Sequence, residues 1–257
     1  MFRTRMGRSA VSAIKPQPGN PHGLTLWQHV FPSKSIGRFA GSDGRVAVRR
    51  CRTKRQFWLA PEDRFFCAQR AWDQRAEAGY MKGIENAFQT VADQIIRGLR
   101  TIDCEQSRIV TKFFALWFLR FEQRHRPTPD HLINGIAPEH LSRDQEEMLE
   151  SNWVSFVGAD RTMSGRCVAG LQIQVKIAQA DAQFEGTRWG VLTASDGEFF
   201  VPDTFGRMTI VPVTPSICLV CTRQDEIISR KEVSELNNIA RHSAWDYYFA
   251  RDFTQCP

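Results

Sequence analysis

The chain has 257 residues, of which 42% are hydrophobic and 11% aromatic, so it can bury a core without disulfides or metal clips. Its seven cysteines, an odd number scattered from Cys51 to Cys256, exclude a dense disulfide framework and indicate a reducing, cytoplasmic setting. The longest apolar run, FFALWFL at 113–119, is too short to cross a bilayer, so we expect neither a membrane span nor a secretory signal.

The net charge of +6 is unevenly distributed along the chain. Twelve of the 34 basic residues lie in residues 1–60, together with one acidic residue, Asp43, whereas the remainder is mildly acidic. This imbalance favours a polyanionic partner, with nucleic acid first and an acidic protein or a ribonucleoprotein as the alternative. A further alternative is that these charges form a solvated face or pair with the acidic body of the same chain.

Residues 1–23 combine Arg, Ser, Pro and Gly and have few large apolar side chains to offset chain entropy. We therefore expect a flexible basic arm, followed by a single domain over residues 24–257. Because the arm is rich in arginine and contains no acidic residue, an organelle transit peptide is its alternative interpretation.

A short β region is expected after the arm. Residues 45–51, RVAVRRC, alternate apolar and basic side chains after a GSDG turn, which is typical of a half-exposed strand. Residues 56–60, QFWLA, are expected to pair with this strand or with the segment before the turn.

The middle of the chain predicts helices. The first is amphipathic, and the second is apolar nearly all round at its centre, which indicates a buried helix. Pro127 ends the second helix, and Pro138 suits the first turn of the third. The expected ranges are 80–99, 104–127, 138–153 and 164–184.

The spacing of apolar residues changes near the C-terminus from a helical pattern to one typical of strands. Short β-rich runs separated by Gly, Pro and Asp predict an antiparallel sheet over residues 189–201, 207–215 and 216–222, and a last helix is expected at 229–244. The order of elements predicts an α+β fold with a short N-terminal β region, a central helical bundle and a C-terminal antiparallel sheet with a final helix.

Several short motifs resemble a bacterial domain-of-unknown-function family. HVFPSKSIGRF at 29–39 is similar to its HYVPQFYLRRF-like N-terminal motif, and TASDGE at 193–198 resembles its late TSDNP-like motif. Gln28 replaces the first histidine of a usual pair, and Gly197-Glu198 replaces Asn-Pro. The resemblance runs from about residue 22 to about 245 and implies a shared fold and site but no reaction. The residues matched to the family are His29, Pro32, Arg38, Phe39, Ile84, Glu85, Arg124 or Arg126 before Pro127, Ser195 and Asp196.

These matches suggest a catalytic site of His29, Glu85, Arg124 and Asp196, supported by Arg38 and Ser195. An imidazole acts as an acid or base near neutral pH, carboxylates orient it or hold a divalent metal, and a guanidinium binds phosphate. In the alternative interpretation each side chain has a local structural role. His29 would then bond a carbonyl, Asp196 would cap a turn and Glu85 would pair with a basic residue.

The basic strand region is the second functional candidate. Its cations would neutralise a nucleic-acid backbone, and Phe57 and Trp58 would stack on unpaired bases or else belong to the core. The expected nucleic-acid-binding residues are Arg45, Arg49, Arg50, Arg52, Lys54 and Arg55. We therefore expect a nucleic-acid-directed effector that acts as a nuclease. A non-enzymatic binding or regulatory subunit and a small-molecule hydrolase or transferase are the alternatives.

Two weaker signals remain. The spacing of Arg120 and His125 resembles the RNA-cutting motif of all-helical nucleases of the higher-eukaryote-and-prokaryote nucleotide-binding class, although the β-rich C-terminus does not suit that fold. Cys218 and Cys221 have metal-ligand spacing, but they lie in an apolar strand without a second pair, which favours structural packing.

Overall fold

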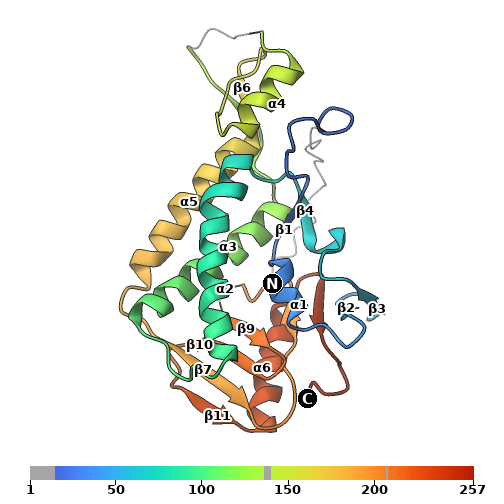
Figure 1. The fold of residues 1–257 in the computed structure, drawn as a ribbon, viewed down its shortest axis with the longest axis vertical. Helices are drawn as coiled ribbons and strands as arrows, with labels where there is room; N and C mark the ends of the chain where they lie inside the picture. Colours follow the sequence, from blue (N-terminus) through green and yellow to red (C-terminus); the bar gives the residue numbers. More distant parts are fainter. Residues whose placement is uncertain (1–14, 136–139, 207) are drawn as a thin grey trace, which may run out of the picture.

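The computed structural model describes residues 15–135, 140–206 and 208–257, and its architecture is α+β (Figure 1). A 3-10 turn, η1 (Arg64–Phe66), and a π-helical turn, η2 (Ala76–Met81), precede the long helices. The α-helices of the described ranges are α1 (Ser33–Gly37), α2 (Lys82–Ile96), α3 (Cys104–His125), α4 (Arg143–Ser151), α5 (Gly165–Gln183) and α6 (Arg230–Ser243).

The described strands form two four-stranded sheets and two short ribbons. One sheet has the order β3-β2-β12-β8, the other has the order β11-β7-β10-β9, and the ribbons pair β1 with β4 and β5 with β6. Their bounds are β1 (Trp27–His29), β2 (Val46–Arg50), β3 (Gln56–Leu59), β4 (Cys67–Gln69), β5 (His131–Leu132), β6 (Thr162–Met163), β7 (Trp189–Ala194), β8 (Val201–Pro202), β9 (Ile210–Thr214), β10 (Ile217–Cys221), β11 (Glu226–Ile228) and β12 (Tyr247–Ala250).

The helices pack as the periodicity predicts. Helix α3 contacts both α2 and α5, and its buried centre includes Phe113 and Trp117. A capping box at Asp103 and Gln106 fixes the start of α3, because it satisfies backbone N–H groups that have no helical partner. In Figure 1 these helices stand above the sheet that contains β7, β9 and β10.

The predicted boundaries of two helices were wrong. Helix α2 ends at Ile96, so Leu99 lies beyond it, and its N-terminal side continues into the π turn η2. Helix α4 begins at Arg143, where Ser142 supplies the capping side chain, while residues 140–142 are not helical. Pro138 lies outside the described residues.

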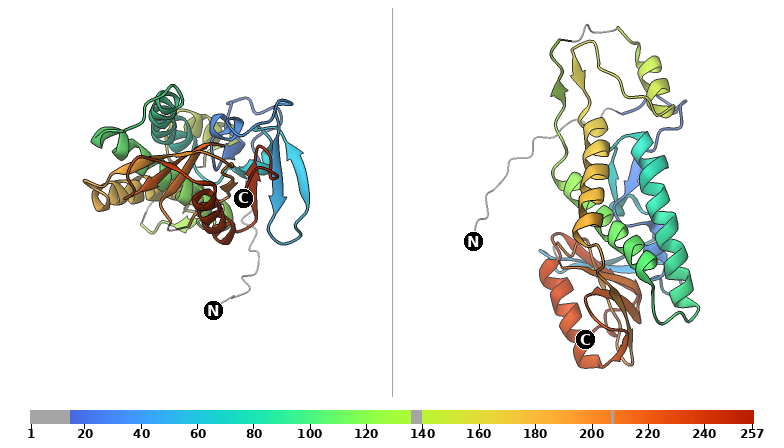
Figure 2. Two further views of the ribbon diagram at one scale, coloured as in Figure 1. Left: turned by 90° about the horizontal axis from the view of Figure 1, so that it is seen from below. Right: turned by 90° about the vertical axis from the view of Figure 1, so that its left-hand side faces the viewer.

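The N-terminal strands and the C-terminus share one sheet, which the sequence order did not predict. Strand β12 pairs antiparallel with both β2 and β8, so Phe249 lies opposite Val48 on one side and Val201 on the other. The hairpin of β2 and β3 extends from this sheet, as the left view of Figure 2 shows. The second sheet is antiparallel except at β11, which runs parallel to β7.

The described part of the basic arm contacts helix α4. The backbone N–H of Gln17 donates to Glu147 Oε1 at 2.8 Å, and His22 Nε2 lies 2.8 Å from Asp144 Oδ1. Residues 1–14, which contain the arm's arginines, lie outside the described residues. None of the helices in the described ranges has the length and apolar character needed to span a bilayer.

The close approach of α5 to the segment after α3 gives a stability prediction. A Cβ at Gly165 would lie 2.0 Å from the carbonyl oxygen of Thr128, whereas one at Gly83 would meet nothing within 4 Å. We expect Gly165→Ala to lower the free energy of unfolding by about 2 kcal/mol, because the backbone must shift. The matched Gly83→Ala should raise it by about 0.5 to 1 kcal/mol through helix propensity. Urea denaturation measures both values, and an unchanged midpoint for Gly165→Ala would contradict this packing.

Candidate functional site

The structure distributes the predicted catalytic residues over three places. His29 and Glu85 line one pocket of about 360 Å³, which we call the His29 pocket. Arg124 lines a different pocket of about 230 Å³, which we call the Arg124 pocket. Asp196 lies on the surface, where its Oδ1 is 3.2 Å from Nη1 of Arg230. The four residues therefore do not line one common pocket.

The predicted supporting residues make local contacts. Arg38 Nη2 and Lys34 Nζ each lie 2.8 Å from the Asp93 carboxylate, which ties α1 to α2. The hydroxyl of Ser195 donates to the carbonyl of Ile228 at 2.9 Å and so joins the ends of β7 and β11. Arg38 thus contacts the lining of the His29 pocket through Asp93. Ser195 and Asp196 lie elsewhere, just after the end of β7.

His29 is held in a defined protonation state. Its Nε2 lies 3.1 Å from the carbonyl oxygen of Pro61, and since a carbonyl only accepts, Nε2 bears the proton. Burial lowers the pKa of His29 below its ordinary value, although the Pro61 carbonyl and Glu85 oppose this effect. The imidazole is therefore neutral at pH 7, and its Nδ1 has a free lone pair.

Beneath this histidine lies an ion-pair network centred on Arg120. Arg120 is 1% exposed, and its guanidinium donates from Nη1 to Glu85 Oε1. Its Nη2 lies 3.3 Å from Glu77 Oε2. The indole N–H of Trp72 donates to the same Glu77 oxygen at 2.5 Å. A buried charge needs such partners, because desolvation is otherwise costly. Arg120 was not among the predicted site residues, although a single arginine inside the apolar run of α3 signals a buried carboxylate partner.

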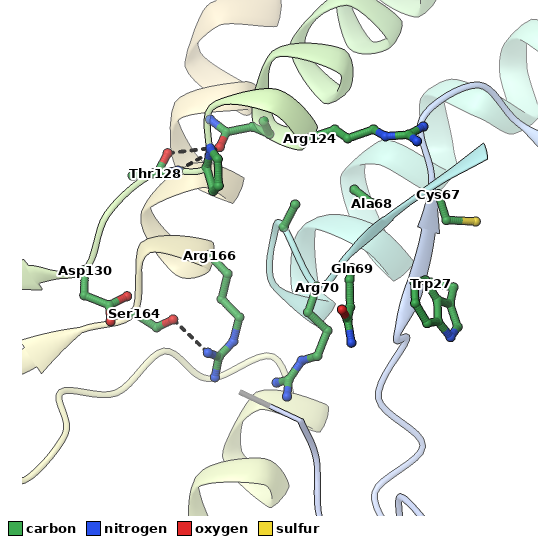
Figure 3. A pocket seen from close by; sticks show the side chains of 13 residues that line it. Trp27, Cys67, Ala68, Gln69, Arg70, Arg124, Thr128, Asp130, Ser164 and Arg166 are labelled. Atoms are coloured by element: carbon green, nitrogen blue, oxygen red, sulfur yellow. Dashed lines mark hydrogen bonds between the residues drawn. The ribbon is translucent and has the colours of Figure 1, made fainter. Parts of the chain in front are cut away.

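The Arg124 pocket has a cationic lining (Figure 3). In the figure the Arg124 side chain extends from α3 toward the strand that contains Cys67, whereas Arg70 and Arg166 lie near each other on the opposite side. Both of those arginines contact the buried carboxylate of Glu150, at 2.7 and 2.8 Å. Asp130 also lines the pocket, where its Oδ1 accepts from the backbone N–H of Gly165.

Arg124 differs from the other two arginines because no carboxylate pairs with it among the described residues. Its Nη2 donates to the carbonyl oxygen of Phe65 at 2.8 Å, and its guanidinium carbon lies 5.8 Å from the ring centroid of Tyr247. These contacts fix the side chain while leaving its charge uncompensated. The arrangement can accept an anion.

Contacts through Phe65 connect this pocket with the hairpin. The guanidinium of Arg50 lies 4.5 Å from the Phe65 ring centroid, and that of Arg64 lies 4.9 Å from the Trp27 ring. Arg50 also pairs with Asp246. We call this surface the basic face, and it comprises Arg50, Arg52, Lys54, Arg55, Arg64 and Arg124.

The predicted nucleic-acid-binding residues divide between the two faces of the hairpin. Arg49 points away from the basic face, since it bonds Gln56 at 2.8 Å and covers the Phe253 ring, and Arg45 is exposed at the other end of β2. Three more occupy the turn between β2 and β3, are exposed and have no ion pair within the described ranges: Arg52, Lys54 and Arg55. Phe57 packs on Phe65, whereas Trp58 is 54% exposed.

The weaker sequence signals have structural explanations. Arg120 and His125 are five residues apart on α3, about 140° around the helix, so they face different surroundings. Cys218 and Cys221 lie three residues apart on β10, which directs the thiols to opposite faces, and both are buried. Within the part of the chain that the structure describes, no three His, Cys, Asp or Glu side chains are placed to hold a metal ion.

His125 provides a test of the environment around Arg124. Burial, together with the neighbouring Arg124 charge, lowers the pKa of His125 from 6.5 to about 4. We expect an NMR titration of its imidazole to have a midpoint near pH 4. Because the unfolded chain binds this proton first, the His125 contribution to stability should be lost as the pH falls from 6.5 towards 4. A midpoint at or above pH 6 would contradict the buried position beside Arg124.

Comparisons of this chain with models of protein families, with curated proteins and with solved structures find no match. The resemblance to the HYVPQFYLRRF-type family thus stays a prediction from short motifs.

Proposed function

We propose that this protein binds single-stranded nucleic acid across the basic face, with a phosphate held in the Arg124 pocket. The observation that supports this most strongly is Arg124, a residue of the pocket lining whose guanidinium has no carboxylate partner in the described ranges. Arginine binds phosphate oxygens through two parallel N–H groups, and such charge-assisted bonds are stronger than neutral ones.

The remaining cations of the basic face extend the charge beyond one phosphate. Arg52, Lys54 and Arg55 project from the exposed hairpin turn, and Arg64 is exposed beside Trp27. A row of cations is what a polyanion recognises, because each neutralised phosphate releases condensed counterions. A single small anion would occupy the Arg124 pocket alone and would not need the other cations of the basic face.

Aromatic side chains beside the basic face favour unpaired bases over a duplex. The Trp27 ring lies under Arg64, and Trp245 is 70% exposed next to Asp246, the partner of Arg50. Aromatic rings stack on bases of any sequence, and they reach base faces only in a single strand. The proposal is therefore binding of a single strand with little base specificity.

Charge substitutions in the hairpin turn test the electrostatic part. Fluorescence anisotropy of a labelled 20-nucleotide single strand would give the association constant over a series of salt concentrations. We expect the triple variant Arg52→Gln, Lys54→Gln, Arg55→Gln to lower the magnitude of the salt slope by about 2, since each phosphate contact on a single strand contributes about 0.7.

A matched variant controls for net charge. Arg100, Arg188 and Lys231 are exposed cations outside the hairpin and the basic face, and their replacement by Gln changes the charge equally. This control should keep the wild-type slope. Equal slopes for wild type and both triple variants would contradict binding at the hairpin turn.

Arg124 is tested separately at constant salt. Arg124→Gln should weaken single-strand binding by about 10-fold or more, because it removes a charge-assisted phosphate contact. Arg108→Gln is the control, since Arg108 pairs with Asp181 at 2.6 Å away from the pocket, and it should stay within twofold of wild type. Thermal unfolding verifies that loss of the Phe65 carbonyl contact leaves the fold intact. Wild-type affinity in a folded Arg124→Gln variant would refute the phosphate site.

A further inference from the structure

The lining of the His29 pocket includes Gln89, a residue with an unsatisfied polar atom. Three buried side-chain atoms of the described residues have no hydrogen-bond partner, namely Gln89 Oε1, Arg38 Nη1 and Arg120 Nε, and of these three residues Gln89 lines the pocket. Gln89 lines the pocket and is nine-tenths buried, and its other amide atom, Nε2, donates to the Ser35 hydroxyl at 2.9 Å. Buried acceptors without donors are rare in folded proteins, so Gln89 Oε1 marks a place for a donor group, which reaches it once the amide turns toward the pocket.

The same pocket contains a second free acceptor. His29 uses its Nε2 proton for the Pro61 carbonyl, and Nδ1 has no partner in the described residues. A neutral imidazole nitrogen of this kind accepts a proton from a hydroxyl group. Gln89 Oε1 and His29 Nδ1 together suit a ligand that presents hydroxyl hydrogens.

Cationic side chains at the rim of the pocket suit a negatively charged group on the same ligand. Lys34 and Lys82 line the pocket, with side chains 58% and 59% exposed. Each is near one carboxylate, Asp93 for Lys34 at 2.8 Å and Glu85 for Lys82 at 3.7 Å, but each ammonium has further donors for solvent or a ligand. The pocket therefore suits a hydroxyl beside a negatively charged group.

The register of the β1–β4 ribbon brings this pocket next to the basic face. His29 pairs with Cys67, which lines the Arg124 pocket, and Trp27 lies two residues from His29 on the same face of β1. Directly opposed residues in an antiparallel pair have their side chains on one face of the ribbon. A strand bound at Trp27 and Arg124 would thus continue past His29.

From this geometry we propose that the His29 pocket accepts a ribose 2′-hydroxyl with its adjoining phosphate, and that His29 is a catalytic residue for RNA cleavage. This inference rests on the proposed single-strand binding and narrows its substrate to RNA. Deoxyribose lacks the hydroxyl that the free acceptors require.

The reaction needs no further reactant. His29 Nδ1 takes the proton of the 2′-hydroxyl, and the 2′ oxygen forms a bond to the adjacent phosphorus. The bond from phosphorus to the 5′ oxygen of the next nucleotide breaks, and that oxygen takes a proton from solvent. The products are a 2′,3′-cyclic phosphate and a free 5′-hydroxyl, and His29 returns its proton to solvent. Lys34 and Lys82 would stabilise the charge that develops on the phosphoryl oxygens.

Arg120 acts in this scheme as a positioning residue. It holds Glu85, whose carboxylate contributes to the electrostatic field at His29. The charged groups that act on His29 are Glu85 from α2, Glu77 from η2 and Arg120 from α3. Burial is a larger influence on the pKa of the imidazole than any one of these charges.

Three oligonucleotides of one sequence test the inference with the full chain: RNA, DNA and 2′-O-methyl RNA. Anisotropy measures binding, and mass spectrometry identifies the products. We expect all three to bind, and only RNA to be cleaved, with a 2′,3′-cyclic phosphate end. His29→Gln, whose amide can still donate to Pro61, should lower the cleavage rate of bound RNA by about 100-fold or more. His242→Gln on α6 is the matched control and should cleave normally.

The outcomes separate the two proposals. Binding of all three strands without RNA cleavage would overturn the catalytic inference and leave single-strand binding intact. Cleavage that persists in His29→Gln, or that yields a 5′-phosphate end, would also overturn it. Failure to bind any strand at low salt would overturn both proposals.

Discussion

The buried guanidinium of Arg120 is the interaction on which the arrangement of this molecule depends. A charge in the interior of a helix bundle is tolerated only when carboxylates and hydrogen bonds compensate it. Glu77 and Glu85 come from η2 and α2, so their pairing with Arg120 joins these elements to α3. The π turn η2 places Glu77 where the indole of Trp72 also binds it, and π turns often occur at functional positions. The floor of the His29 pocket is therefore fixed by an ion-pair network.

A second constraint positions the basic face. Strand β12 at the C-terminus pairs with β2 near the N-terminus, and the buried carboxylate of Asp203 accepts the backbone N–H groups of Trp245 and Asp246, both at 2.8 Å. Burial raises the pKa of Asp203 to about 6. These bonds fix the segment that presents Trp245 and pairs Asp246 with Arg50, so a C-terminal segment completes a surface built from N-terminal cations.

The elements that were predictable from the sequence have local signals. Strand β2 follows from alternation, and α6 from its apolar period and the capping box at Ser229 and Glu232. Strand β12 has only four residues and follows a helix, and it is held by β2, some two hundred residues earlier, and by β8, so no local pattern indicates it. The same reason explains the short ribbon of β1 and β4, in which three pairs depend on contacts between distant segments.

The candidate site was predictable only in part, because whether its residues meet depends on contacts between distant segments. The motif resemblance singled out His29 and Glu85, which the fold brings to one pocket, but spacing along the chain contains no information on whether Arg124 and Asp196 join them. Asp196 lies just after the end of β7 and pairs at the surface with Arg230 at the start of α6. The apolar residues next to Arg120 in the sequence indicate that this arginine is buried. Its partners could be identified only from the packing of η2 and α2 against α3.

The central claim is that a single strand lies across the basic face and past His29. Photo-crosslinking of a 4-thiouridine-containing RNA, followed by mass spectrometry of the peptides, tests this most directly. The account predicts crosslinks in β1, in the turn between β2 and β3, and in β4. Crosslinks confined to the sheet of β9 and β10 would contradict it.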